Sequence, residues 1–404
     1  MFQIKSIKEQ YELKDKILKE RLEQLLPKIM CSSKADAWVI ACKEYHEDLL
    51  FPLLVPASYL TARRVTMLVF IKQQEQIRRF SLSLPDEDLE KYYERYWDYQ
   101  NETQSEALNR LFDEFDVQHI AWNTSEDSAF ADGLSAGLYK QYTRELKPCY
   151  TKRFIEDKLL AMKLMEIRTE TEKSLYPHVL EAAFTVIEDT FSKHTIVPGV
   201  TTCADLEWHM MQKVQDMGLV YWFSPTIDLQ REGQGPRYYG VIEKGDLLHC
   251  DFGIRYMNLC TDTQRNAYVA KDDETEIPEK IKKGFAINNR FQDIVRESFQ
   301  LNMTGNQVFS KAIAQAKKEG IRPCLYSHPC NVYGHGPGTL IGLYTKQEEI
   351  PIRGDIRLDY DTVFALELNI QYEDMTFYSE ETVLFDENGV HFLYPGRDQI
   401  YFIK

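Results

Sequence analysis

Two apolar hairpins with acidic residues inside their strands constrain the fold of this 404-residue chain more than any other feature. The first lies in GDLLHCDFGIRYMNLCTDTQRNAYV, where two strand-like runs flank a turn predicted at Arg255–Asn258. A turn centred there places Asp251 opposite Asp262. Opposed residues of an antiparallel pair point to the same face, with Cβ atoms about 4.5–5.5 Å apart. Two carboxylates so placed repel each other unless a cation or a proton lies between them.

A second segment, DTVFALELNIQYEDMTFYSEETVLF, repeats this arrangement with a turn predicted at Glu373-Asp374. In that register Glu367 faces Glu380, whereas Glu381 points to the other side of the sheet. The apolar residues around Glu367 indicate a buried strand, where a lone charge is very costly. Each hairpin is therefore predicted to present two carboxylates on one face.

Between the hairpins lies the segment SHPCNVYGHGPGTLIG, in which glycines bracket His335. Glycine lets a backbone approach a site closely, so this loop can offer its imidazole to the carboxylates. Four carboxylates and one imidazole are suitable donors for two divalent cations with a bridging water. Taken singly, each acidic residue or loop histidine has an ordinary structural explanation. The coincidence of two opposed carboxylate pairs is what favours a metal site.

The order of strands and helices predicts two domains. Residues 1–150 combine short buried strands (AWVIAC, TMLVFI and HIAWN) with helical stretches (DEDLEKYYERYWDYQ and EALNRLFDEFD), which predicts a smaller N-terminal α/β domain. Residues 155–404 contain two successive units of long helix, second helix and strands. The first long helix is expected from about Phe154 to His194. This repetition predicts a duplicated α+β architecture with an antiparallel sheet and pseudo-twofold symmetry.

Composition excludes several classes of protein. The chain has 48 Lys and Arg against 63 Asp and Glu, a formal charge of −15, which argues against a nucleic-acid partner. No apolar run reaches the ~18 residues of a membrane helix, and the N-terminus lacks the apolar stretch of a secretory signal. None of the eight Cys stands in a C-x-x-C pair, so neither a zinc ribbon nor a disulfide framework is indicated. We expect a soluble cytoplasmic enzyme with no membrane contact.

The C-terminal half resembles the pita-bread metallopeptidases, which are aminopeptidase P, prolidase, methionine aminopeptidase and their non-peptidase relative creatinase. CDFG…CTDTQR is similar to the family pattern D-x-G…D-x-T-R, and GHGPG to G-H-G-x-G. ALELN is similar to the strand x-x-E-P-G, and SEETVLF to i-E-D-T-v-l-v. The resemblance covers about residues 155–404 and implies a pita-bread fold there. The N-terminal part is similar in size and pattern to a creatinase-type N-terminal domain.

This resemblance implies a role for each ligand. Asp251 would chelate one metal ion, Asp262 and Glu380 would bridge both ions, and His335 and Glu367 would hold the other. Glu367 would also act as general base toward the bridging water. The implied cofactors are two divalent ions, Mn²⁺ or Zn²⁺, with Co²⁺ or Fe²⁺ as alternatives.

Three departures from the family pattern bear on substrate handling. Aminopeptidase P and methionine aminopeptidase have a second His seven residues after the ligand His, and with His335 as ligand that position is Gly342. The family His upstream of the first Asp is missing from DLQREGQGPRYYGVIEKG, and Leu368-Asn369 replaces a Pro-Gly pair. His328 is then a candidate catalytic hydrogen-bond donor in place of these histidines, or a structural loop residue. Arg397 either lies near the site or neutralises the acidic pocket.

The resemblance therefore implies an Xaa-Pro aminopeptidase or Xaa-Pro dipeptidase acting on peptide substrates. The alternative is a creatinase-like C–N hydrolase or a pita-bread binding protein without peptidase activity. Aminopeptidases of this fold need a closed end near the substrate's amino terminus, which the N-terminal domain or a dimer partner usually supplies, and we therefore expect a homodimer. Ser135 in GLSAG matches the G-x-S-x-G elbow of serine hydrolases, but no buried strand precedes it. Ser135 is therefore expected in a loop or at the start of a helix.

Overall fold

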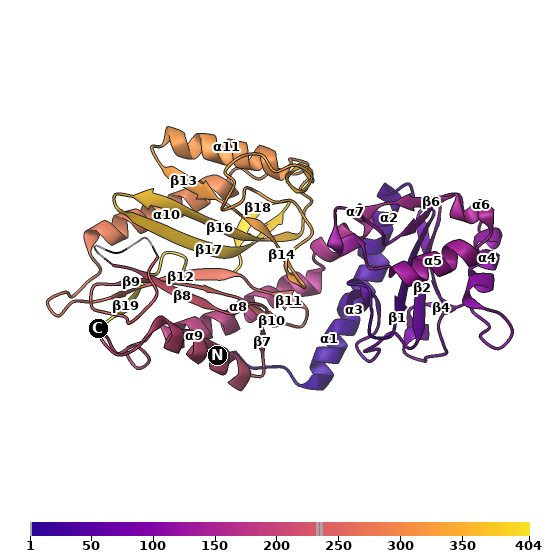
Figure 1. Cartoon of the computed structure of the whole chain (residues 1–404), viewed down its shortest axis with the longest axis horizontal. Coiled ribbons are helices and arrows are strands. Elements are labelled where there is room, and N and C mark those ends of the chain that lie inside the picture. Colours follow the sequence, from indigo (N-terminus) through magenta and orange to yellow (C-terminus); the bar gives the residue numbers. More distant parts are fainter. Residues whose placement is uncertain (1, 232–233, 235–236) are drawn as a thin grey trace. The chain divides into compact units, whose positions relative to one another are not determined.

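A computed structural model describes residues 2–231, 234 and 237–404 (Figure 1). The chain forms two compact units. The N-terminal unit comprises Lys5–Met165 and Thr169–Thr171, and the C-terminal unit comprises Met1–Ile4, Glu166–Arg168 and Glu172–Lys404. Within the described residues, no helix is both long and apolar enough to cross a bilayer.

The N-terminal unit is built on a mixed six-stranded sheet with the strand order β4-β3-β2-β1-β5-β6. Its strands are β1 (Ala37–Lys43), β2 (Val65–Gln73), β3 (Gln76–Ser81), β4 (Glu94–Arg95), β5 (Ile120–Trp122) and β6 (Phe154–Glu156). Its helices are α1 (Ile7–Glu20), α2 (Leu26–Ser32), α3 (Phe51–Leu54), α4 (Gln104–Glu114), α5 (Ala136–Glu145), α6 (Pro148–Thr151) and α7 (Lys158–Glu166, which ends in the C-terminal unit). The three predicted strands form β1, β2 and β5, which confirms the α/β prediction for this part.

One predicted helix of this unit is wrong. The segment DEDLEKYYERYWDYQ forms a 3₁₀ turn at Leu89–Lys91 and then β4. The Asp86 carboxylate caps this turn by accepting hydrogen bonds from the backbone N–H groups of Asp88 and Leu89. The next bonds are of the short 3₁₀ type, from the Lys91 N–H to the Asp88 carbonyl and from the Tyr92 N–H to the Leu89 carbonyl. Tyr93 is buried and donates its hydroxyl to the Leu54 carbonyl, which holds the chain beside β3.

The C-terminal unit contains a ten-stranded sheet with the central order β15-β14-β16-β17-β12-β9-β8. Its members are β8 (Thr226–Gln230), β9 (Leu247–Phe252), β12 (Thr263–Val269), β13 (Arg322–Leu325), β14 (His328–Asn331), β15 (Gly334–His335), β16 (Thr362–Tyr372), β17 (Met375–Asp386), β18 (Gly389–Phe392) and β19 (Tyr401–Ile403). A small separate sheet contains β7 (Val220–Tyr221), β10 (Ile254–Tyr256) and β11 (Leu259–Cys260).

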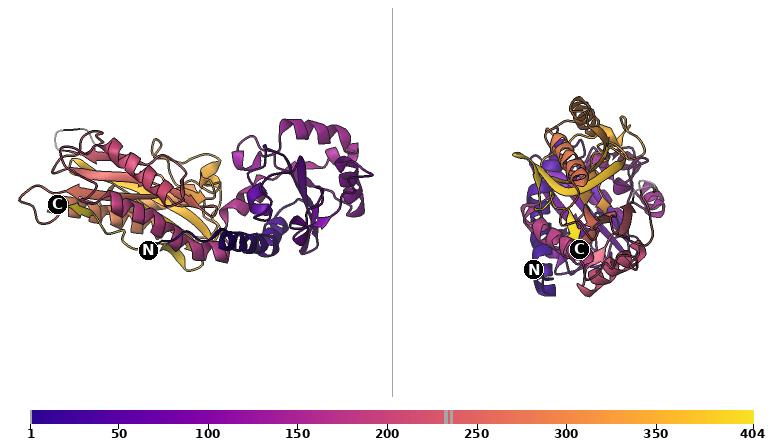
Figure 2. Two further views of the ribbon diagram at one scale, coloured as in Figure 1. Left: turned by 90° about the horizontal axis from the view of Figure 1, so that it is seen from below. Right: turned by 90° about the vertical axis from the view of Figure 1, so that its left-hand side faces the viewer.

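The helices that accompany this sheet in the described part of the chain are α8 (Glu170–Thr190), α9 (Cys203–Asp216), α10 (Glu279–Arg296) and α11 (Gly305–Lys318). Helices α10 and α11 contact β16, β17 and β13, and α9 contacts β8, so that helices line the strands of both halves (Figures 1 and 2). Two helices and a long hairpin thus occur twice, as the duplicated α+β architecture predicted.

The long helix predicted from Phe154 to His194 is interrupted. It forms β6, α7 and α8, with a break between the two helices. In this break Ile167 pairs with Thr362, the first residue of β16, and the Arg168 backbone N–H donates to the Asp361 carbonyl. Strand pairing therefore replaces the helical hydrogen bonds at this position.

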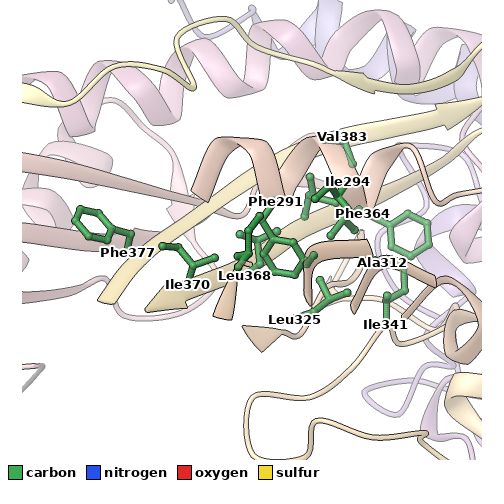
Figure 3. Close-up of a cluster of buried hydrophobic side chains, with 14 of the residues drawn as sticks. Phe291, Ile294, Ala312, Leu325, Ile341, Phe364, Leu368, Ile370, Phe377 and Val383 are labelled. Atoms are coloured by element: carbon green, nitrogen blue, oxygen red, sulfur yellow. The ribbon is translucent and has the colours of Figure 1, made fainter. Parts of the chain in front are cut away.

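The strand β16 separates an apolar face from a polar one. Phe364, Leu366 and Leu368 are fully buried in a cluster with residues of α10 and α11 (Figure 3). Burying each such side chain contributes about 1.5–3 kcal/mol relative to exposure. Since successive side chains alternate between faces, Glu367 points to the opposite side, where the sheet carries its polar residues.

The two hairpins differ in how well their registers were predicted. Strands β16 and β17 pair with Glu367 opposite Glu380, as expected. In the first hairpin the turn lies at Met257-Asn258, both with positive φ, as in the two-residue hairpin turns in which Asn is favoured. The predicted opposition of Asp251 and Asp262 is therefore wrong, because Asp251 faces Gln264 instead. A shift of two residues preserves the face, so both aspartates still lie on the same side of the sheet.

Candidate metal centre

The four central strands place their polar residues in one row across the sheet. Asp251 on β9 pairs with Gln264 on β12, Gln264 pairs with Glu380 on β17, and Glu380 pairs with Glu367 on β16. Asp262 lies two residues before Gln264 and therefore on the same face. The two hairpins thus gather four carboxylates on one face, entirely within the C-terminal unit.

Strand β14 brings His328 to these carboxylates. It pairs with β16 through His328 and Ala365, two residues from Glu367. His328 Nε2 lies 3.5 Å from Asp262 Oδ2, 3.8 Å from Glu380 Oε1 and 3.9 Å from Glu367 Oε2. Its side chain is buried, so this imidazole faces three of the four carboxylates at once.

His335 reaches the same place from the next strand. Strand β15 folds back on β14 and pairs His335 with Cys330. The His335 ring stands edge-on to His328, with ring centroids 4.5 Å apart, and edge-on to Trp222 at 5.3 Å. The preceding Gly334 has a φ of +82°, and a Cβ there would lie 2.3 Å from the Trp222 ring, so this close approach requires glycine.

All these groups line one cavity of about 210 Å³. Its lining consists of the four carboxylates, both imidazoles and two aromatic side chains, which are Asp251, Asp262, Glu367, Glu380, His328, His335, Trp222 and Phe223. The polar groups thus converge on a confined space with one aromatic wall.

Burial dominates the electrostatics of the carboxylates. It raises the pKa of Asp251 to about 6, and it raises the pKa values of Asp262, Glu367 and Glu380 well above their usual range. Neighbouring carboxylates raise the pKa values of these last three further. Among the described residues, neither oxygen of Glu380 nor Oδ1 of Asp251 has a hydrogen-bond partner. Such buried oxygens require a proton or a cation.

The imidazoles have the opposite property. Burial lowers the pKa of His328 to about 3, with His335 and Arg353 adding to the effect, and burial and Arg353 lower the pKa of His335. A neutral imidazole is the form that binds a metal ion.

The donor atoms fall into overlapping groups, each within 4.8 Å. The groups are Asp251, Asp262 and Glu380; His328, Glu367 and Glu380; and Asp262, His328 and His335. Carboxylates shared between groups and a mixed O/N donor set fit a pair of borderline divalent cations.

Three other predicted residues lie outside the cavity. Glu381 faces the other side of β17, as predicted, and binds Arg265. The placement of Arg397 near the site is wrong, because this side chain binds Asp293 on α10 and its charge acts on Glu381. Ser135 begins helix α5 and its hydroxyl accepts the Leu138 N–H, which confirms the expected helix start.

The sequence interpretation missed several residues around the carboxylates, notably Trp222, Phe223, His249, Asp228 and Gln264. The position of Gln264 could have been predicted, because it follows Asp262 by two residues and strand alternation puts both on one face. The positions of Trp222 and Phe223 could not, since they depend on how the segment after β7 packs against the glycine-rich loop around His335.

The sequence comparison identifies the family. Residues 177–392, more than half of the chain, match the model of metallopeptidase family M24. The chain belongs to this family. The resemblance to pita-bread metallopeptidases is thereby confirmed, and with it the expectation of a metal-dependent hydrolase. No curated protein matches the M24 chain in sequence.

Solved structures share the fold of this M24 protein over nearly its whole length. An X-Pro aminopeptidase from Thermotoga maritima MSB8 has a TM-score of 0.65 at 16% identity and covers 93% of this chain and 99% of its own. An Xaa-Pro dipeptidase from Bacillus anthracis has 0.63 at 16%, with 96% and 99% covered. A prolidase from Pyrococcus furiosus has 0.55 at 15%, with 91% and 98% covered. The two-unit architecture is thus shared with these proteins.

Proposed function

We propose that this M24 protein is a dinuclear metallopeptidase that releases the residue preceding proline, as an Xaa-Pro aminopeptidase or, on dipeptides, an Xaa-Pro dipeptidase. The observation that carries the proposal is a set of four carboxylates beside two imidazoles in one cavity, in which buried oxygens of Asp251 and Glu380 have no hydrogen-bond partner among the described residues. The activities named for the structural relatives support the proline specificity.

The proposed ligands are Asp251, Asp262, Glu367 and Glu380, together with a histidine. Two divalent ions, Mn²⁺ or Zn²⁺ with Co²⁺ or Fe²⁺ as alternatives, would lower the pKa of a bound water and polarise the scissile carbonyl.

We propose that His328 is the imidazole ligand and that His335 holds the outer position, which exchanges the roles expected from the sequence. Two observations support this exchange. His328 Nε2 lies within 3.9 Å of three carboxylates, and His328 belongs to two of the donor groups while His335 belongs to one. With His328 as ligand, the family's second His, seven residues later, is also present, because that position is His335.

The remaining groups then have distinct tasks. The Glu367 carboxylate would take a proton from the attacking water and deliver it to the leaving amine. His335 would donate a hydrogen bond to the oxyanion that develops on the scissile carbonyl. Trp222 and Phe223 would exclude bulk water from one side of the cavity and contact the substrate side chain.

Metal analysis followed by a peptide panel tests this function. After loading with Mn²⁺ or Zn²⁺, we expect about two equivalents of metal and release of single amino-terminal residues from Xaa-Pro peptides, but not from matched Xaa-Ala peptides. Glu367→Gln should abolish turnover. Wild-type protein that stays metal-free, or that binds metal and cleaves no Xaa-Pro peptide, would refute the proposal. Hydrolysis of creatine would support the C–N hydrolase instead.

We further propose a homodimer, because closing one end of the substrate cleft near the peptide amino terminus needs a second surface. Light scattering of the purified protein should give twice the chain mass, and a monomer with full aminopeptidase activity would contradict this.

A further inference from the structure

A chain of hydrogen-bonded side chains runs from Glu367 on β16 past β17 to residues on three further strands of the sheet. Gln264 Nε2 on β12 donates to Glu367 Oε1 at 2.7 Å, and His249 Nε2 on β9 lies 3.0 Å from Gln264 Oε1. His249 Nδ1 in turn lies 3.2 Å from Asp228 Oδ2 on β8. Gln264, His249 and Asp228 are all buried, so these contacts are shielded from competing water.

The chemistry of the end groups orients the whole chain. As a deprotonated metal ligand Glu367 only accepts hydrogen bonds, so the Gln264 amide turns its NH₂ group to Glu367. Its carbonyl oxygen then faces Nε2 of His249, while Nδ1 of the same ring faces the Asp228 carboxylate. Arg237 Nε donates to Asp228 Oδ2 at 2.8 Å and holds that carboxylate in turn. The Gln264 amide on one side and the Asp228 carboxylate on the other therefore hold the His249 ring between them.

This orientation divides the two oxygens of Glu367 between two tasks. Oε1 is taken by the Gln264 amide, while Oε2 is the oxygen that faces His328. We propose that Gln264, His249 and Asp228 are positioning residues that hold Glu367 so that Oε2 alone is presented to the cavity. The inference rests on the proposed function in that Glu367 is taken as metal ligand and general base.

The chain of contacts depends on glutamine at this position. The family pattern D-x-T-R has a threonine where CTDTQR has Gln264. A threonine side chain ends one atom beyond Cβ, and it offers a hydroxyl rather than an amide with a separate donor and acceptor. It cannot bind Glu367 and His249 at once in the way that the Gln264 amide does.

The test measures Mn²⁺ affinity by calorimetry in the full-length protein. Gln264→Met keeps the length of the side chain and removes both hydrogen bonds, and His249→Phe removes the contact behind it. We expect each variant to bind Mn²⁺ about 10–100-fold more weakly, the range typical of residues that orient a metal ligand. The double variant should be no weaker than Gln264→Met, because His249 acts through Gln264. For peptide hydrolysis, kcat should fall while KM stays within about twofold.

Thr263→Val provides a matched control on the same strand. Thr263 is equally buried but points to the other face, where its hydroxyl donates to the Phe252 carbonyl. This variant should keep wild-type Mn²⁺ affinity although it loses a buried hydrogen bond. Urea unfolding of all variants would show that they are folded under the conditions of the titration.

Two results would overturn the inference: wild-type Mn²⁺ affinity in Gln264→Met, or losses in the single variants that add up in the double variant. Because affinity is measured without peptide, failure of the Xaa-Pro specificity leaves the test intact. If the wild-type protein binds no Mn²⁺, crystal structures of wild type and Gln264→Met decide the matter. An unchanged Glu367 rotamer in the variant would then refute the positioning role, and a changed one would support it.

Discussion

Glu380 and Glu381 are neighbours on β17, and both are buried, yet the two faces of the sheet treat them in opposite ways. On the helix side, Glu381 binds Arg265 through two hydrogen bonds of 2.7 and 3.0 Å. On the cavity side, neither oxygen of Glu380 has a hydrogen-bond partner among the described residues. The contrast teaches that burial alone does not mark a functional acid. A buried carboxylate without a donor, next to others of its kind, is the one that needs a cation.

The largest expected effect comes from Glu380→Gln, which keeps the shape of the side chain and removes its charge. We expect this variant to lose metal binding and to show only background peptidase activity. Its metal-free form should be at least as stable to urea as the wild type, because a repelled buried charge is gone. Elemental analysis and urea unfolding check both parts. If the variant binds metal with wild-type affinity, the unpaired Glu380 carboxylate is not a metal ligand and its contrast with Glu381 has no functional meaning.

The partner on the other face should respond in the opposite way. Arg265→Leu leaves Glu381 buried without its cation, and we expect a loss of about 3–5 kcal/mol in the free energy of unfolding. The metal stoichiometry of the folded fraction should stay at two. Combining Arg265→Leu with Glu381→Leu should restore much of the stability, since an apolar pair replaces the ion pair. If the single variant loses metal in its folded form, the two faces are not independent.

The contrast between these faces was largely predictable from the sequence. Alternation along SEETVLF separates Glu380 from Glu381, and the apolar residues of β16 indicate which strand is buried. The register of the first hairpin was not predictable, because residues 255–258 allow more than one turn and each shifts the pairing by two residues. A shift of two residues leaves each side chain on the same face of the sheet, so the four carboxylates were still correctly predicted on one face.

Which of the two histidines lies nearer the carboxylates could not be predicted from the sequence. The glycines around His335 suggested the ligand loop, but His328 lies nearer the carboxylates because β14 pairs with β16 beside Glu367. This pairing depends on contacts distant in the sequence, and so do the Trp222 wall and the chain from Glu367 to Asp228. Local sequence patterns do not predict such long-range contacts.

A third prediction distinguishes the two histidines and shows which imidazole binds metal together with the four carboxylates. His328→Ala should lose one metal ion, because it removes a proposed ligand. His335→Ala should keep both ions and lower kcat about 10²–10³-fold, the effect of removing one donor to a developing oxyanion. Metal analysis together with kinetics distinguishes them. The reverse pattern would restore His335 as the ligand and contradict the exchange of roles.

The cavity side should also make the metal-free protein sensitive to pH. The pKa of Asp251 rises from 3.8 in its ordinary state to about 6 in the folded protein, chiefly through burial. Between these values the folded state retains a proton that the unfolded state has lost, so raising the pH lowers the free energy of unfolding. Urea unfolding with a chelator should therefore show falling stability from about pH 4 to pH 6. Added Mn²⁺ should reverse the fall at pH 7, and a metal-free protein that gains stability over this range would contradict the reasoning.

The smallest effect is expected at Ser135. Its hydroxyl, like the Glu381 carboxylate, already has a hydrogen-bond partner within the protein. Its oxygen accepts the Leu138 N–H at the start of α5, and the cap of a helix typically contributes about 1 kcal/mol. Ser135→Ala should therefore lower the free energy of unfolding by about that amount, with Ser135→Asp, another good capping residue, as the matched control that retains it. Peptidase activity and metal content should be unchanged in both variants, since the residue lies in the N-terminal unit and carries no chemistry of its own. A loss of hydrolysis in a fully folded Ser135→Ala protein would mean that a hydroxyl already bound to the backbone still acts on substrate. The distinction between satisfied and unsatisfied polar groups would then fail as a guide to the functional site.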